Sequence, residues 1–263
     1  MFEYAFMQYA FIASLFISIL CGVMGVFVVA RRTAFFTHTL SEISFSGAAF
    51  GVFMGISPIS GMILFTITSA LFVGVSGNQI SRRESSISVF SAIFIGLGIL
   101  FLSLSDKQSS YATNILFGSI VGIDIHGLHE LIALSIVILV VVALIYRKLK
   151  YTTFDGVGAQ YNSTINMYVS ILFLVLVACT VSVTAQVVGS LLIFALLTIP
   201  ASAAKYLAKT VVGMMILTFI FALIGTWLGL YLSYLTNWPV SFFITAIEGV
   251  IYTLALTWNK VDN

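Results

Sequence analysis

Residues 8–32 read QYAFIASLFISILCGVMGVFVVARR, a run of 23 residues without a charge that closes on Arg31 and Arg32. About 20 consecutive apolar residues in a helix cross the hydrocarbon core of a bilayer. The stretch therefore predicts a membrane-spanning helix with a basic pair at one membrane surface. The whole chain has the same character, because 60% of its 263 residues are hydrophobic and only 8% are charged. A soluble domain carries about 25% charged residues, so most of this surface must face lipid.

Apolar runs of this kind recur along the chain, separated by short polar or basic segments. We expect helices over nine ranges: 8–30, 36–56, 61–76, 87–103, 128–146, 167–184, 187–204, 211–235 and 240–258. The sequence thus predicts an all-α polytopic transmembrane helical bundle, a single domain over residues 1–263. The number of spans is nine, or eight if residues 187–204 only dip into the membrane. Residues 111–127 are half-polar and rich in glycine, and we expect them to form a surface or re-entrant segment.

Basic residues fall almost entirely after the odd-numbered runs. Ten of the 11 Lys and Arg residues lie there, and Lys107 alone lies after an even-numbered run. Because Lys and Arg accumulate in cytoplasmic loops, we expect an external N-terminus and a cytoplasmic C-terminus in the cell membrane. The longest loop on the cytoplasmic side, at about residues 151–166, is polar.

Two of the nine acidic residues, Glu42 and Glu248, fall inside expected membrane helices. A carboxylate in the membrane is costly and indicates a functional site by default. His38 precedes Glu42 by four residues, which places both side chains on one helix face. An imidazole and a carboxylate together suit Mn²⁺, Zn²⁺ or Fe²⁺. The alternatives are a structural His–Glu pair buried between helices and, for Glu248, a bond to a neighbouring hydroxyl.

Several enzyme motifs are missing from the sequence. It has no G-x-x-x-x-G-K-[ST] phosphate-binding loop, no G-x-S-x-G nucleophile turn and no H-E-x-x-H zinc site. His126, His129 and Glu130 do not have zinc-protease spacing, and we expect Asp124 and Glu130 to be ordinary residues of a helix start. The chain is therefore not expected to be an enzyme or to hold ATP itself.

Four stretches, in chain order, resemble the permease family of manganese, zinc and iron ABC importers. They are VVARR at 28–32 leading into the 40–47 helix, LFGSIVG at 116–122, Phe154-Asp155 with Ala159, and VGSLLIFALLTIPA at 188–201. The resemblance implies a type II importer-like permease that works as a homodimer. It also implies a separate cytoplasmic ATP-binding subunit and an extracellular metal-binding protein. The cargo would be a divalent metal ion, with no resident cofactor in this chain and no nucleic-acid partner.

The same resemblance implies how this subunit is driven. In such permeases the cytoplasmic Phe-Asp loop docks on the ATPase, which would assign coupling to Phe154, Asp155 and Ala159.

The resemblance also bears on the metal pathway. The family typically carries an Asp and, four residues later, a His on the second helix, so His38 and Glu42 keep the ligand types in reverse order. An Asp is common before the outer proline, where this chain has Asn237. The expected metal-pathway residues are His38, Glu42, Asn237 and Glu248.

Other functions fit some of these features. A permease of the same architecture could import a metal chelate or a cobalamin-like compound. An ion-coupled secondary transporter would use Glu42 and Glu248 as proton carriers and would need no ATPase. A non-transporting membrane scaffold is the third alternative.

Overall fold

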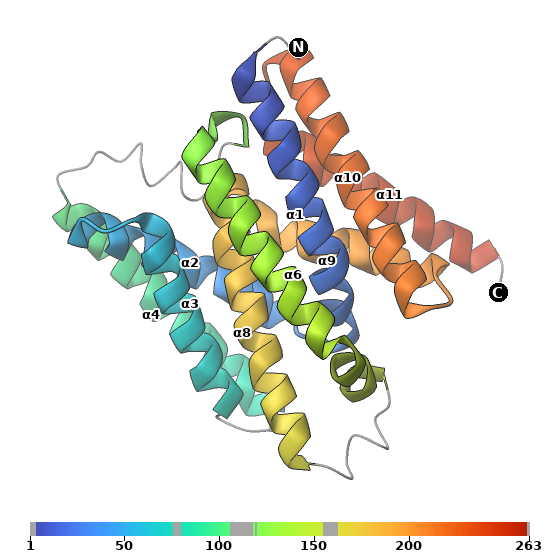
Figure 1. The fold of residues 1–263 in the computed structure, drawn as a ribbon, viewed down its shortest axis with the longest axis horizontal. Coiled ribbons are helices and arrows are strands. Elements are labelled where there is room, and N and C mark those ends of the chain that lie inside the picture. The colour runs from blue at the N-terminus through green and yellow to red at the C-terminus, as the bar shows by residue number, and fades with distance from the viewer. Residues whose placement is uncertain (1–3, 76–79, 106–117, 119, 155–162, 262–263) are drawn as a thin grey trace.

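The structure is a computed structural model that describes residues 4–75, 80–105, 118, 120–154 and 163–261 (Figure 1). Within them the chain forms nine α-helices and one short 3₁₀ turn. They are α1 (Ala5–Ala30), α2 (Ala34–Met54), α3 (Pro58–Val75), α4 (Ile80–Leu104), η1 (Ile120–Gly122), α6 (Ile125–Phe154), α8 (Ser163–Val188), α9 (Ser190–Leu207), α10 (Val211–Thr236) and α11 (Val240–Val261). The expected all-helical bundle is confirmed.

Eight of the nine described helices are long and apolar enough to cross a membrane, and α2 is the exception. The sequence left open whether residues 187–204 cross the membrane or only dip into it. α9, which covers most of them, is long and apolar enough to cross. α2 is not, because serines, threonines, His38 and Glu42 lower its hydropathy. Most of α2 is buried among other helices, so it does not need an apolar face toward lipid.

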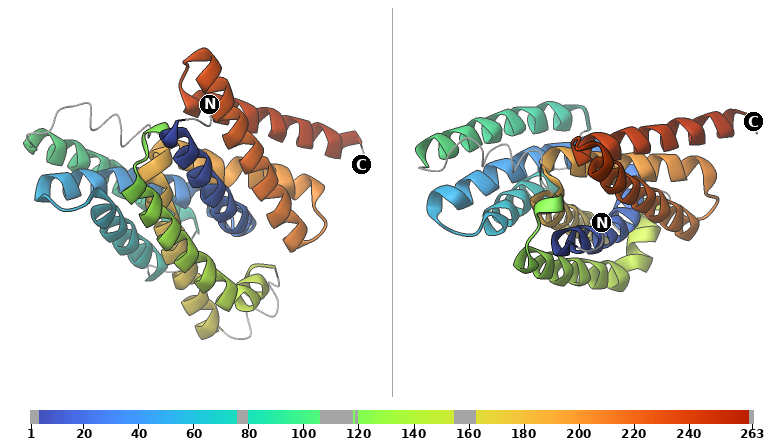
Figure 2. Two further views of the ribbon diagram at one scale, coloured as in Figure 1. Left: turned by 45° about the horizontal axis from the view of Figure 1, so that its top comes forward. Right: turned by 90° about the horizontal axis from the view of Figure 1, so that it is seen from above.

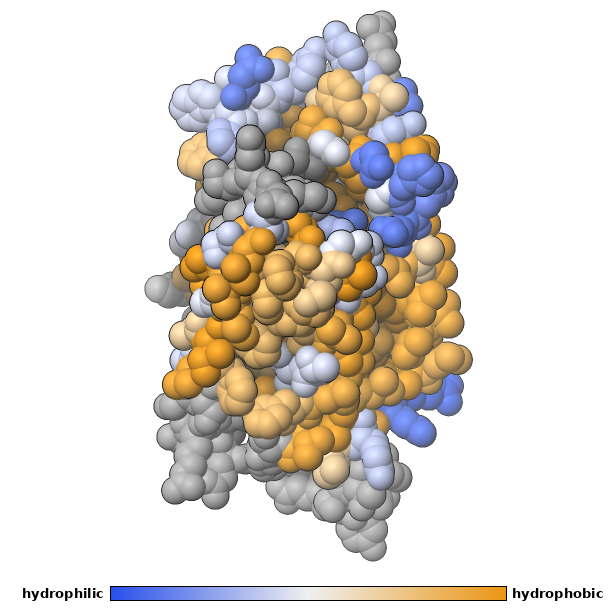
Figure 3. Space-filling model, turned by 90° about the vertical axis from the view of Figure 1, so that its left-hand side faces the viewer, coloured by the Kyte–Doolittle hydropathy of each residue, from blue (hydrophilic) through white to orange (hydrophobic). Residues whose placement is uncertain are grey.

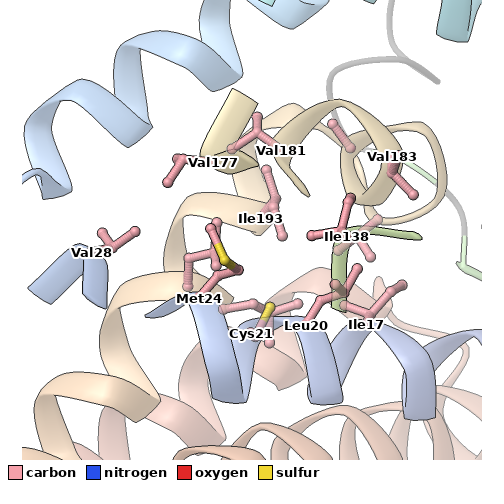
Figure 4. Packing of buried hydrophobic residues seen from close by; sticks show 14 of the residues in the cluster. Ile17, Leu20, Cys21, Met24, Val28, Ile138, Val177, Val181, Val183 and Ile193 are labelled. Atoms are coloured by element: carbon pink, nitrogen blue, oxygen red, sulfur yellow. The ribbon is translucent and has the colours of Figure 1, made fainter. Parts of the chain in front are cut away.

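The bundle has a centre and two flanks. α1 lies in the middle and packs on α6, α8, α9 and α10. α2, α3 and α4 form one flank, and α10 and α11 the other, as the views of Figures 1 and 2 show. The core around α1 joins Leu20, Cys21 and Met24 to Val181 of α8 and Ile193 of α9 (Figure 4). The three central helices therefore present apolar residues to one another.

The outer surface of the bundle is apolar. Leu144, Val75 and Leu254, on three different helices, are exposed by 81%, 68% and 63%. On the face formed by the α2–α4 side, hydrophobic residues make a broad band and hydrophilic residues gather toward its edges (Figure 3). A soluble protein would bury such side chains, so this band is the surface that faces lipid tails.

The turn between α1 and α2 is tight and well defined. Arg32 has a φ of 56°, its backbone N–H donates to the carbonyl of Val29, and the N–H of Thr33 donates to the carbonyl of Val28. This pair of bonds is the Schellman arrangement that ends a helix. α2 then begins at Ala34, so the start of α2 is held directly to the end of α1.

The loop expected on the cytoplasmic side is shorter than the sequence predicted. The helix expected to end at Tyr146 continues to Phe154, and α8 begins at Ser163. The hydroxyls of Thr152 and Thr153 bond back to the carbonyl of Leu149, and this local bonding satisfies them inside the helix. The remainder of the expected loop, residues 155–162, lies outside the described residues.

The distribution of basic residues along the chain assigns several segments to the outer membrane side, and these segments also lie together in space. Met7, Gly118, Val188 and Asn237 line one cavity of about 680 Å³, and all four belong to the expected outer side. Gly118 has a φ of 65° and leaves no room for a Cβ beside the backbone of Val188, so two of the stretches that carried the resemblance pack on each other. The alternation of sides along the chain is therefore consistent with the packing.

Candidate functional site

His38 and Glu42 lie on one face of α2, one turn apart. Nδ1 of His38 is 3.7 Å from Oε1 of Glu42, and the two side chains are exposed by 40% and 25%. Glu42 is eight residues from the start of α2, or about 12 Å along the helix axis. The pair is therefore a partly exposed imidazole and carboxylate in the first half of α2.

Two residues from other helices hold this pair. The hydroxyl of Ser91 on α4 donates to Oε2 of Glu42. The ring of Phe194 on α9 packs edge-on against His38, with ring centroids 4.9 Å apart. Nδ1 of His38 and Oε1 of Glu42 face each other, and contacts from α4 and α9 hold the two side chains in this arrangement.

The separation of the two atoms suits a bridging cation. At 3.7 Å it exceeds the usual length of a direct N–H···O bond. First-row divalent metals bind imidazole nitrogen and carboxylate oxygen at about 2.1 Å, and two such ligands 3.7 Å apart subtend about 120° at the metal. Each chain thus offers two ligands in a spacing that a transition-metal ion can bridge.

The small and hydroxylated residues of α2 serve helix packing. The hydroxyl of Ser44 bonds to the carbonyl of Ser41, and Ser46 donates to the carbonyl of Phe94 on α4. Gly47 and Gly61 bring the backbones of α2 and α3 into direct contact, so that a Cβ on either would overlap the other's carbonyl oxygen. Close helix contacts through small residues are usual in membranes. This packing holds α2, and with it the His38–Glu42 pair, against α3 and α4.

Glu248 occupies a different place, on α11. Its side chain is fully buried, and neither carboxylate oxygen has a hydrogen-bond partner in the described part of the chain. It packs on Gly225 of α10, where a Cβ would overlap its oxygen. The alternative in which Glu248 is held by a nearby hydroxyl has no support among those residues. A buried carboxylate without a bond remains a candidate for function.

Asn237, the last of the four expected metal-pathway residues, lies in the turn between α10 and α11. It ends α10 with a φ of 58° and lines the 680 Å³ cavity with Ser233, Trp238 and Ser241. This cavity is at the end of the molecule that the basic residues predict to be outside the cell. No three His, Cys, Asp or Glu residues form a metal-sized cluster within the described ranges. His38 and Glu42 are therefore brought together as a pair, and Glu248 does not join them.

Phe154, the one expected coupling residue that the structure describes, is at the opposite end of the molecule from Asn237 (Figure 1). Phe154 is the last residue of α6; its side chain is half exposed, and its ring lies 6.5 Å from that of Phe27 on α1. Asp155 and Ala159 lie outside the described residues. The helix end beside Phe154 also carries Arg147 and Lys150, which line a hollow of about 520 Å³.

Sequence reasoning missed the residues that orient the pair. Ser91 lies in an apolar run with no distinguishing neighbour, so no local signal marks it. Phe194 lies inside the stretch 188–201 that carried the resemblance, but its contact with His38 depends on how α9 packs against α2. Asp124, in contrast, accepts a bond from the backbone N–H of Gly127 at 2.9 Å, which confirms its expected role at a helix start.

Comparisons with known proteins agree over nearly the whole chain. The profile of the ABC 3 transport family matches residues 3–259. The "Manganese transport system membrane protein MntC" of Listeria monocytogenes is 30% identical and covers 96% of this chain and 90% of its own length. The "Manganese import system permease protein ScaB" of Streptococcus parasanguinis is 29% identical over the same shares of the two chains.

Two solved structures share the fold. "PsaBC from Streptococcus pneumoniae in complex with Fab" has a TM-score of 0.87 at 26% identity and covers 99% of this chain and 96% of its own. A putative metal-chelate type ABC transporter in an inward-facing conformation has a TM-score of 0.71 at 17% identity, covering 95% of this chain and 85% of its own. The second likeness concerns the fold alone.

Proposed function

Because the chain belongs to the ABC 3 transport family and is the membrane-spanning permease subunit of an ABC transporter, we propose that it imports a divalent metal ion, with manganese as the first candidate. The observation that carries the proposal is the His38–Glu42 pair, 3.7 Å apart and partly exposed on α2. The relatives named for manganese transport support the choice of metal.

In this proposal two copies of the chain form the pathway. One chain offers two ligands, and a closed metal site usually has at least four. A second copy that presents its own His38 and Glu42 would complete the shell. Loose, shared coordination also suits a transported ion, which must leave the site again. Asn237 would receive the ion at the outer mouth from an extracellular metal-binding protein, and Glu248 would serve it only after α11 moves.

A separate cytoplasmic ATPase would drive the movement through the segment that follows Phe154. The exposed ring of Phe154 and the basic residues beside it are the features that support docking there. Asp155 and Ala159 would belong to the same docking segment.

The test is uptake of Mn²⁺, Zn²⁺ and Fe²⁺ by the complete transporter reconstituted in lipid vesicles. We expect Glu42→Gln and His38→Ala each to lower metal uptake at least tenfold while the complex assembles and hydrolyses ATP. Glu42→Gln keeps the shape of the side chain and removes the charge that attracts a cation.

Glu130→Gln is the matched control, because it removes an exposed carboxylate on α6 and should leave uptake unchanged. Wild-type uptake in Glu42→Gln would show that the carboxylate is structural and would defeat the proposal.

A further inference from the structure

Arg31 bonds to both helices that flank residues 155–162. Its Nε donates to the hydroxyl of Thr153 at 2.8 Å, and another of its nitrogens donates to Thr152, both at the end of α6. Its Nη1 donates to the hydroxyl of Ser170 on α8 at 3.3 Å. One side chain at the end of α1 therefore binds the helix that enters the coupling segment and the helix that leaves it.

An aromatic cluster reinforces these bonds. The guanidinium of Arg31 lies over the ring of Phe173 on α8, 4.7 Å from its centroid. Phe27, one turn before Arg31, is fully buried and contacts Phe173, Phe154 and Tyr146, with centroids 6.3 to 6.5 Å apart. The half-exposed Phe154 ring is thus joined to the end of α1 by direct packing.

The choice of arginine matters for this arrangement. Burial lowers the pKa of Arg31 to about 10, so the group stays charged at neutral pH. Holding a charge in a half-buried place is costly, and apolar residues would hold the same helices together without that cost. The planar guanidinium reaches three hydroxyls in fixed directions and stacks on a ring, which a lysine ammonium cannot do. The arrangement therefore fixes the relative orientation of three helices, α1, α6 and α8.

The end of α1 is in turn rigidly joined to α2. The Schellman turn over Arg32 and Thr33 leaves only three residues between the two helices. His38 follows Ala34, the first residue of α2, by one helical turn. A displacement of α6 at Thr152 or of α8 at Ser170 would therefore reach the start of the helix that carries His38 and Glu42.

We propose that Arg31 is the positioning residue that transmits movement of the ATPase-docking segment to α2. The inference rests on the proposed function, because it takes residues 155–162 to contact the ATPase and His38 and Glu42 to bind the ion. Arg31 touches neither the ion nor ATP.

The experiment compares Arg31→Gln and Arg31→Lys in the complete transporter, reconstituted with its ATPase in vesicles. Three quantities are measured: the ATPase that co-purifies, the ATP hydrolysed and the Mn²⁺ taken up. We expect both variants to keep the ATPase bound and hydrolysis within twofold of wild type, while uptake per ATP falls at least fivefold. A role limited to holding the fold would lower all three quantities together. Arg32→Gln is the control, since Arg32 is exposed at the adjacent position and should keep the wild-type ratio.

A second variant keeps the test decisive if the Arg31 variants do not fold. Thr152→Ala combined with Thr153→Ala removes two acceptors of the guanidinium and leaves its stacking on Phe173 intact. It should lower the same ratio. A wild-type ratio in the folded Arg31 variants, or in this double variant, overturns the inference. Wild-type complex that imports no divalent metal would instead defeat the proposed function, so the two failures are distinguishable.

Discussion

At the scale of single residues, the two acids inside the membrane differ in their surroundings. Glu42 is partly exposed, accepts a bond from Ser91 and faces His38. Glu248 is fully buried against Gly225, with no bond to either oxygen among the described residues. Glu42 is therefore partly accessible in this structure, whereas Glu248 is closed off by the helices around it.

Glu248→Gln tests whether that buried carboxyl is retained for transport. The substitution keeps the volume and removes an ionisable group that has no partner, so the melting temperature in detergent should stay the same or rise. Metal uptake should fall at least tenfold, because residues that cost stability are usually retained for function. Gly249→Ala, the neighbouring position with open space around it, is the control for disturbance of α11. Uptake at the wild-type rate in Glu248→Gln would make Glu248 structural.

At the scale of helices, α2 is unlike the others. It is too polar to count as a membrane span by composition, and most of its residues are buried against α3, α4, α8 and α9. Its position depends on direct backbone contact with α3 through glycines. The helix that carries His38 and Glu42 is thus largely covered by its neighbours, and its glycines set how closely it packs on α3.

Gly47→Ala should disturb this placement. The added methyl group would overlap the carbonyl oxygen of Gly61, and overpacking of this kind costs about 1–3 kcal/mol. We expect a lower melting temperature and a loss of uptake as α2 moves. Gly96→Ala on α4 is the matched control, because nothing lies within 4 Å of that position and alanine is the better helix former. Equal melting temperatures for the two variants would show that α2 and α3 are not in tight contact.

At the scale of the whole molecule, the chain has two polar ends and an apolar middle. Asn237 and the 680 Å³ cavity are at one end. Arg31 and the end of α6 are at the other. The candidate pair, His38 and Glu42, lies on α2, which begins three residues after Arg31. If the end with the cavity is outside the cell, this arrangement is the one expected of an importer.

Membrane sidedness can be measured directly. In a background with Cys21→Ala and Cys179→Ala, a single cysteine is placed at Ser57 or at Lys209, both in exposed turns. An impermeant maleimide added to intact cells should label the cysteine at position 57, while the one at 209 should react only after permeabilisation. The reason is the excess of Lys and Arg on the side of Lys209. Labelling of both positions in intact cells would refute the expected topology.

The sequence alone was enough for the helical architecture, the family and the candidate pair. Apolar length, charge-free runs and the resemblance at 188–201 are properties of contiguous residues, and the comparisons confirm the family they indicated. The pairing of His38 with Glu42 follows from helical periodicity, which acts within one turn. All of these are local features, so they are readable without knowing how the helices pack.

Tertiary structure alone decided what surrounds those residues. Ser91 and Phe194 meet the pair from 49 and 156 positions away along the chain, and Arg31 meets Thr153 across 122 positions. The burial of Glu248 likewise depends on α10 packing over it. Such contacts depend on which helix faces fit together, and this fit is set by the shapes of side chains that are distant in sequence. No local pattern contains that information, which is why hydropathy found the helices but not their partners.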